Sequence, residues 1–151
     1  SDLILLNCCH TFISLIGTNF LPPWADTFKE VSAMAKKVLI VDDNPNMSSL
    51  LSEMLEVFDY DSIRASDGQE ALQHVQQGNI SLVITDMRMP NMSGLELLQK
   101  VKEDNPNLPV VLISGYSMGV LEDQNYDLKP DGFLGKPLSM SEVEKMLNNL
   151  L

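Results

Sequence analysis

The stretch Val-Leu-Ile-Val-Asp-Asp, at residues 38–43, is a short run of β-branched and aliphatic residues that ends directly in two carboxylates. Four more short, mostly apolar runs follow it along the chain, at Ser62–Ala65, Leu82–Thr85, Val110–Ile113 and Gly132–Leu134. Longer segments with helical periodicity lie between these runs and after the last one. The pattern predicts five β-strands that alternate with five α-helices.

Capping signals predict where three of these helices begin. Asn44-Pro45 is typical of an N-cap followed by the first helical residue. The helix that it opens has an apolar face made of Leu50, Leu51, Met54, Leu55 and Phe58. Asp67 with Glu70, and Ser139 with Glu142, have the spacing of a capping box and open the second and fifth helices.

The third and fourth helices differ in the strength of their signals. Ser93 opens the third helix, Asn105-Pro106 ends it, and its predicted buried residues are Leu95, Leu98 and Val101. The fourth helix, at about residues 117–125, contains three residues of low helix propensity, namely Gly119, Asp123 and Asn125. We therefore expect the fourth helix to be short or mobile.

The alternation of strands and helices predicts a parallel sheet, because right-handed crossovers place helices on both of its faces. The expected fold class is α/β, a three-layer, doubly wound, five-stranded parallel sheet. Ligand sites in such folds lie outside the carboxyl ends of the strands, at the point where the strand order reverses. The residues that directly follow each strand are therefore the candidates for a functional site.

Chemically capable side chains follow four of the five strands: Asp42, Asp43, Asp86, Ser114 and Lys136. With a strand order of 2-1-3-4-5, the three aspartates converge in one crevice. Three carboxylates at close range repel one another unless a cation lies among them. An oxygen-rich pocket without His or Cys favours a hard cation such as Mg²⁺. The added lysine and serine suit a phosphoryl group carried on a nucleophilic carboxylate.

From Lys36 to Leu151 the chain resembles the receiver domain of two-component response regulators, and in particular the single-domain, chemotaxis-regulator-like receivers. The motifs that carry the resemblance are Val41-Asp42-Asp43, Asp86-Met87-Arg88-Met89-Pro90-Asn91-Met92-Ser93-Gly94, Ser114-Gly115-Tyr116 and Lys136-Pro137. They stand in the family's order with family-like spacing. The resemblance implies a flavodoxin-like fold with the strand order 2-1-3-4-5.

The resemblance also implies a role for each residue that matches a family motif. Asp86 is expected to be the phosphoacceptor, which attacks the phosphohistidine of a partner kinase. Asp43, a carboxylate oxygen of Asp86 and the backbone carbonyl of Arg88 are expected to hold Mg²⁺. Asp42 is expected to act on the ion largely through bound water.

Two further positions match the family's conformational switch. Ser114 is expected to hydrogen-bond a phosphoryl oxygen once Asp86 is modified, and Lys136 is expected to pair with another. Phe133 matches the switch aromatic, which turns inward as the serine hydroxyl moves; it is Phe rather than Tyr, so any role of a phenolic hydroxyl is lost. In many receivers the Lys136–Pro137 peptide bond is cis, and Arg88 and Tyr116 occupy positions that tune the lifetime of the aspartyl phosphate.

The function that the resemblance implies is phosphorelay signalling. We expect a stand-alone receiver that accepts a phosphoryl group from a sensor histidine kinase or a phosphotransfer protein. Its own chemistry is limited to self-phosphorylation and self-dephosphorylation, so it is a phosphoacceptor domain rather than an enzyme. We expect no output domain after the fifth helix, and we therefore expect output through a downstream protein that contacts the fourth helix, the fifth strand and the fifth helix.

Two alternatives come from other functional classes. A haloacid-dehalogenase-like phosphohydrolase also uses a strand-end aspartate and Mg²⁺, but it requires a second acid two residues after the nucleophile, where this chain has Arg88. It also requires a cap domain, for which the chain has no room. A degenerate receiver that serves only as an interaction module is disfavoured by the intact acid pair and by Asp86, Ser114 and Lys136.

Charge and cysteine content limit the partners and the compartment. The chain has 151 residues and a formal net charge of -11, so it would repel a nucleic-acid backbone. Its two cysteines, Cys8 and Cys9, are adjacent and rarely meet disulfide geometry, which favours a reducing compartment, and we expect a cytoplasmic protein. The apolar stretch Leu3–Ile16 is too short and too polar for a membrane span, and no basic residue precedes it.

The domain division predicted from the sequence is an N-terminal extension at residues 1–35 and a receiver domain at residues 36–151. One hypothesis is that the extension is upstream sequence without a selected role, included through a misassigned start codon or by cloning. The other is that it is a functional arm, in which Trp24, Phe28 and Val31 share one helical face. That face would pack on the domain or on a second copy, which makes a homodimer the alternative oligomeric state.

Overall fold

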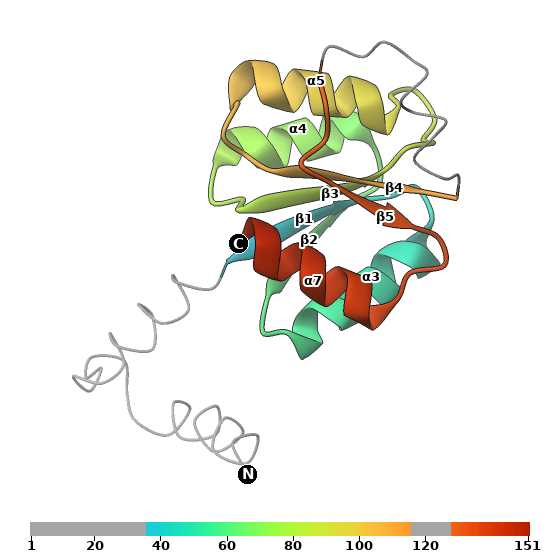
Figure 1. The fold of residues 1–151 in the computed structure, drawn as a ribbon. Helices are drawn as coiled ribbons and strands as arrows, with labels where there is room; N and C mark the ends of the chain where they lie inside the picture. Colours follow the sequence, from blue (N-terminus) through green and yellow to red (C-terminus); the bar gives the residue numbers. More distant parts are fainter. Residues whose placement is uncertain (1–35, 116–127) are drawn as a thin grey trace, which may run out of the picture. The chain divides into compact units, whose positions relative to one another are not determined.

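The computed structural model describes residues 36–115 and 128–151, in which strands and helices alternate (Figure 1). The strands are β1 (Lys37–Val41), β2 (Asp61–Ala65), β3 (Leu82–Asp86), β4 (Val110–Ser114) and β5 (Gly132–Gly135). The helices are α3 (Pro45–Val57), α4 (Gly68–Gln77), α5 (Gly94–Asp104) and α7 (Met140–Leu150). All five predicted strands and the first, second, third and fifth predicted helices are confirmed.

The strands form one parallel sheet in the order β2-β1-β3-β4-β5, which confirms the predicted topology. The order in which strands are added to the sheet therefore reverses between β1 and β3, since β2 lies on one side of β1 and the other three strands lie on the other side. The register pairs Val41 of β1 with Thr85 of β3, and Asp86 of β3 with Ile113 of β4. Residues that follow these three neighbouring strands consequently meet at one edge of the sheet.

Two apolar cores lie on opposite faces of the sheet. Successive strand residues point to opposite faces, so Val38 and Ile40 pack with α3 and α7, whereas Leu39 and Val41 pack with α4 and α5. Figure 1 shows the same two pairs of helices on the two sides of the sheet. Every residue of β3 and β4 is buried, as expected for strands covered on both faces. The three-layer prediction is confirmed.

The capping box predicted at the start of α4 is only half formed. The Asp67 side chain accepts a hydrogen bond from the Glu70 N–H at 2.9 Å, as predicted. The Glu70 carboxylate accepts instead from the N–H and the hydroxyl of Ser66, at 2.8 and 2.9 Å. A fully reciprocal box is present at the start of α5, between Ser93 and Glu96. The predicted N-caps Asn44 and Ser139 are confirmed, and for the box predicted between Ser139 and Glu142 the bond from the Glu142 N–H to the Ser139 hydroxyl is present at 3.3 Å.

The buried faces of two helices differ from the prediction by one residue each. On α3 the buried apolar side chains are Leu51, Met54 and Leu55. Leu50 is 42% exposed, because a one-residue step turns a side chain by about 100° around a helix. On α5, Leu97 is fully buried, whereas Leu95 is only partly buried. The prediction was therefore wrong at Leu50 and missed Leu97, whereas Leu95 packs against the core as a partly buried residue.

An ion pair fixes the start of the edge strand β5. The Lys102 ammonium group, at the end of α5, lies 2.7 Å from Asp131 Oδ2 and donates to the Leu108 carbonyl at 2.8 Å. The same Asp131 oxygen accepts the Val110 N–H at 2.9 Å. These bonds join the end of α5 to the starts of β4 and β5. They hold in register the strand that leads into Lys136.

Several predictions fall on residues that the structure does not describe. The predicted fourth helix at 117–125, Tyr116 and the extension at 1–35 lie outside the described residues. Within residues 36–115 and 128–151, none of the helices combines the length and the apolar character needed to span a membrane. The Lys136–Pro137 peptide bond is cis, as the family resemblance predicted.

Candidate functional site

Three carboxylates meet at the carboxyl end of the sheet. Asp42 and Asp43 directly follow β1, and Asp86 is the last residue of β3. One oxygen from each of them lies within 4.8 Å of the others. Asp42 and Asp86 are buried, with 4% and 8% of their surface exposed, and Asp43 is exposed. The structure thus brings together the three aspartates that the sequence analysis selected.

The charge of this cluster is unfavourable without a counter-ion. Two unit charges 4.8 Å apart repel by roughly 3 kcal/mol at an effective dielectric constant of about 20. Solvent weakens this repulsion for the exposed Asp43, but it screens the buried pair Asp42 and Asp86 less. The geometry therefore favours a bound cation, protonation of one carboxylate, or both.

Asp42 shows the effect of this environment most clearly. Its Oδ1 accepts the Asn44 N–H at 2.8 Å, whereas its Oδ2 is buried and has no hydrogen-bond partner among the described residues. Burial raises the pKa of Asp42 above its ordinary value of 3.8, and the neighbouring Asp86 carboxylate raises it further. The bond from Asn44 and the charge of Lys136 act in the opposite direction. Asp42 is thus a buried acid with one oxygen available to a ligand.

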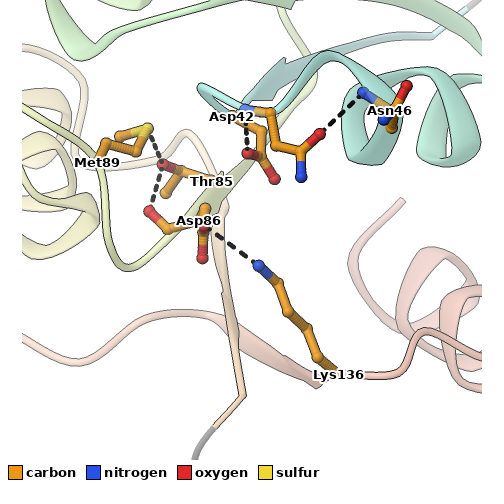
Figure 2. A network of polar contacts seen from close by, with 7 residues as sticks. Asp42, Asn46, Thr85, Asp86, Met89 and Lys136 are labelled. Carbon is orange, nitrogen blue, oxygen red and sulfur yellow. Dashed lines mark hydrogen bonds and ion pairs between the residues drawn. The ribbon is translucent and has the colours of Figure 1, made fainter.

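Lys136 reaches the cluster from the other side of the crevice. It follows β5, and its ammonium group lies 3.2 Å from Asp86 Oδ2 (Figure 2). The Lys136 side chain is 30% exposed, so it closes the pocket on one side and still meets solvent. The Lys136 N–H also donates to the Ser114 carbonyl at 2.9 Å. The lysine is therefore fixed at its backbone and paired at its tip.

Ser114 lies at the end of β4, next to the strand that carries Asp86. The register pairs Asp86 with Ile113, so Ser114 stands one residue beyond Asp86 at the same edge. It is 4% exposed and pairs with Gly135 of β5. The backbone of Ser114 thus lies at the carboxyl end of the sheet, on the strand next to the one that carries Asp86.

The remaining two predicted residues, Phe133 and Arg88, are not members of the carboxylate cluster. Phe133 is partly buried in β5, where it pairs with Leu112 and lines a hollow of about 310 Å³ between β5 and α7. Arg88 is exposed, in the loop that connects β3 with α5. The structure therefore places Phe133 away from the acid cluster on the same strand that leads to Lys136.

Two residues near Asp86 escaped the sequence analysis. The buried Thr85 hydroxyl donates to the Asp86 carbonyl at 3.1 Å and lies 4.0 Å from the Met89 sulfur (Figure 2). A Cβ atom on Gly94 would lie only 2.3 Å from the same carbonyl oxygen. Thr85 was identified only as a strand residue, and Gly94 was quoted only as part of a motif. The backbone of Asp86 is thus held from two sides.

The chemistry of the donor set fits a hard divalent cation. All candidate ligands are oxygens, and the unpartnered Asp42 Oδ2 is a buried acceptor that a cation or its bound water would satisfy. The surplus negative charge of three carboxylates against Lys136 would be offset by a doubly charged ion. The described part of the cluster contains no His or Cys, which are the side chains that favour zinc.

Replacing the buried acid tests this account of the pocket. In the absence of divalent cations we expect Asp42→Asn to increase the free energy of unfolding by about 1–2 kcal/mol, because it removes an incompletely paired buried charge. A carboxyl whose pKa is raised by folding stabilises the native state only when protonated, so its contribution declines as pH rises through the raised pKa. Urea unfolding in EDTA should therefore show a larger gain at about pH 7 than at about pH 4.5.

The matched control is Asp104→Asn, which makes the same chemical change at an exposed position in the last turn of α5. That variant should change the free energy of unfolding by less than about 0.5 kcal/mol at either pH. With saturating Mg²⁺ the order of stability of wild type and Asp42→Asn should reverse, so that wild type becomes the more stable of the two. An Asp42→Asn protein that is less stable than wild type in EDTA would contradict the account.

Comparison with known proteins agrees with this site. A family model described as the response regulator receiver domain matches residues 38–148. The sensor protein EvgS of Escherichia coli K12 is 34% identical over 113 residues, which cover 75% of this chain and 9% of that protein. The regulator PhoP of Bacillus subtilis, described as an alkaline phosphatase synthesis transcriptional regulatory protein, is 30% identical over 118 residues, 78% of this chain and 49% of that protein. The chain thus spans at most about half of these two relatives.

Solved structures show the same fold. The response regulator TrrA of Thermotoga maritima, solved in complex with Mg²⁺-BeF, superposes with a TM-score of 0.71 at 32% identity and covers 77% of this chain and 99% of that one. The chemotaxis protein CheY4 of Vibrio cholerae has a TM-score of 0.72 at 27% identity, with 78% and 99% coverage. With its family model matched over most of its length, the chain belongs to the response regulator receiver domains of two-component signalling.

Proposed function

We propose that the chain accepts a phosphoryl group on Asp86 from a histidine kinase or a phosphotransfer protein. The observation that carries this proposal is the meeting of three carboxylate oxygens within 4.8 Å, with the Lys136 ammonium group 3.2 Å from Asp86. Receiver domains are phosphoacceptors rather than enzymes that act on a separate substrate. The relatives include sensor proteins that contain such a domain, which supports a kinase as the donor.

In the proposed reaction, a carboxylate oxygen of Asp86 attacks the phosphorus of a phosphohistidine. An O–P bond forms, the P–N bond breaks, and the imidazole of the donor leaves. Lys136 is already paired with Asp86 and would pair with a phosphoryl oxygen instead, as the aspartate oxygen becomes the bridging oxygen of an acyl phosphate. The hydroxyl of Ser114, at the end of the neighbouring strand, would donate to a second phosphoryl oxygen.

The proposed metal ligands are Asp43, a carboxylate oxygen of Asp86 and the backbone carbonyl of Arg88. Asp42 would act largely through water, which agrees with its free, buried Oδ2. When bound, Mg²⁺ would supply positive charge to the phosphoryl oxygens. Removal of Mg²⁺ should therefore abolish the reaction and leave the fold intact.

The proposed output is a change in a protein-binding surface formed by the predicted fourth helix, β5 and α7. Phe133 supports this proposal, because it lies on β5, three residues before Lys136, and lines the hollow beside α7. A hydroxyl shift at Ser114 would change the space available to this ring. That the chain works as a stand-alone receiver, that its receiver begins near residue 36, and that residues 1–35 form a dimerising arm stay predictions.

The proposed function predicts Mg²⁺-dependent labelling of the chain by a small-molecule phosphodonor. Incubation with acetyl phosphate and Mg²⁺ should add one phosphoryl group per chain, as measured by intact-protein mass spectrometry. EDTA should reduce the labelled fraction to background, since the repulsion among the carboxylates then opposes approach of the anion. A folded chain that binds Mg²⁺ but is never labelled, by acetyl phosphate or by any tested kinase, would favour the interaction-module alternative.

A further inference from the structure

Besides accepting the Ser48 N–H at its carbonyl, Asn44 makes two bonds that serve different parts of the molecule. Its backbone N–H donates to Asp42 Oδ1 at 2.8 Å, and its side-chain oxygen accepts the Asn46 N–H at 3.0 Å. Figure 2 marks both bonds with dashed lines, one of which ends at the labelled Asp42 and the other at the labelled Asn46. The first bond belongs to the acidic pocket, and the second makes Asn44 the N-cap of α3.

The two bonds depend on one backbone conformation. Asn44 has φ -91° and ψ 109°, the extended conformation that an N-cap residue adopts before the first helical turn. This conformation lets the side chain turn back over the helix start, and it also directs the residue's own N–H toward Asp42. The Asn44 carbonyl also accepts the Ser48 N–H at 3.1 Å, and Pro45 favours an extended residue before it. A residue that does not cap keeps these restraints but loses the side-chain bond that ties it to the first turn of α3. The cap of α3 and the orientation of Asp42 are therefore linked through a single residue.

The orientation of Asp42 matters because its two oxygens have different environments. Oδ1 is satisfied by the Asn44 N–H, so Oδ2 is the oxygen that remains for a ligand. Asp42 and its neighbour Asp86 are both buried. If the Asp42 side chain rotated away, bulk water would therefore not readily take the place of its carboxylate oxygen. Loss of the bond to Oδ1 would thus disturb the arrangement of the carboxylate oxygens.

We propose that Asn44 is a positioning residue for the acidic pocket: it holds the Asp42 carboxylate in its cation-binding orientation by capping α3. This inference rests on the proposed function, in which the pocket binds Mg²⁺. Partners that orient metal ligands without touching the metal commonly change metal affinity by about 10–100-fold when removed. The sequence analysis identified Asn44 only as a helix cap.

The test compares Asn44→Ala, which cannot cap, with Asn44→Ser, which can. Titration of the full chain with Mg²⁺ by isothermal calorimetry should give a dissociation constant about tenfold higher for Asn44→Ala than for wild type. Asn44→Ser should return it to within about twofold, because Ser is also a strong N-cap residue. The rate of labelling by acetyl phosphate at subsaturating Mg²⁺ should change in the same order.

Ser139→Ala controls for general destabilisation, since Ser139 caps α7 through the Glu142 N–H and makes the same kind of bond. It should lower the thermal unfolding midpoint about as much as Asn44→Ala and leave the Mg²⁺ affinity unchanged. Equal affinities of Asn44→Ala and wild type would overturn the positioning role while leaving the proposed function standing. A wild-type chain that binds no Mg²⁺ would overturn both. If Asn44→Ala fails to fold, Asn44→Gly replaces it, because Gly tolerates the cap position but lacks the bonding side chain. A Mg²⁺ affinity of Asn44→Gly equal to that of wild type would again overturn the positioning role of Asn44.

Discussion

Asp86→Asn should abolish Mg²⁺-dependent labelling of the chain by acetyl phosphate, with a loss of at least about a thousandfold in rate. The amide has nearly the same size as the carboxylate, but it is a poor nucleophile and cannot form the acyl phosphate. Asp86 is also a member of the carboxylate cluster and the partner of Lys136. The substitution therefore removes the attacking atom and weakens the binding of the cation at the same time.

Two measurements separate these effects. The labelled fraction is followed by intact-protein mass spectrometry at increasing Mg²⁺, up to concentrations at which calorimetry shows the variant to be saturated. Loss of labelling that persists at saturation identifies Asp86 as the acceptor. Asp104→Asn, an exposed change of the same kind on α5, should label as wild type does. Unchanged labelling of Asp86→Asn, on whatever other side chain, would show that the acceptor has been assigned to the wrong residue.

Most of the architecture was predictable because its signals are local. Three strands, β1, β3 and β4, are short and mostly apolar runs that are buried on both faces, so they lack the alternation that marks a half-exposed strand. The exception is β2, with the sequence Asp-Ser-Ile-Arg-Ala. The convergence of Asp42 and Asp86 followed once the strand order was known, because the register sets β1 beside β3. The strand order itself came from the family resemblance.

The finer features were not predictable, because they depend on distances between residues that the sequence does not fix. The Glu70 carboxylate bonds to Ser66 rather than to Asp67, a choice of one residue that local spacing does not decide. The exposure of Leu50 depends on the rotation of α3 against the sheet. The bond from the Asn44 N–H to Asp42 could not be inferred either, since a cap signal describes the side chain and not the N–H.

Gly94 illustrates a further signal that the sequence alone could not interpret. It begins α5, and a Cβ atom there would lie 2.3 Å from the Asp86 carbonyl oxygen and 3.0 Å from the Met87 Cα. Both neighbours are backbone atoms, so neither can move aside as the end of a side chain can. The Gly94 N–H also donates to the Met87 carbonyl at 3.0 Å, which holds the two segments together.

Gly94→Ala should therefore decrease the free energy of unfolding by about 3 kcal/mol, the upper range for inserting a group into a packed interior. The sign of this change in stability is informative. Ala is the better helix former, so the substitution would stabilise α5 by up to about 1 kcal/mol if space were available. The start of α5 and the backbone of Asp86 must separate to admit the methyl group. The acceptor would then shift relative to Asp42 and Lys136, and we expect labelling by acetyl phosphate to slow about tenfold in the folded protein.

Gly135→Ala is the matched control, since Gly135 also adjoins a site residue, Lys136, yet a Cβ atom there would have no heavy atom within 4 Å. It should change the free energy of unfolding by less than about 1 kcal/mol and leave the labelling rate within about twofold of wild type. Urea unfolding monitored by circular dichroism gives the first quantity, and mass spectrometry of the folded protein gives the second. A Gly94→Ala variant as stable and as reactive as wild type would mean that the contact between α5 and the Asp86 backbone is not what holds the acceptor in place.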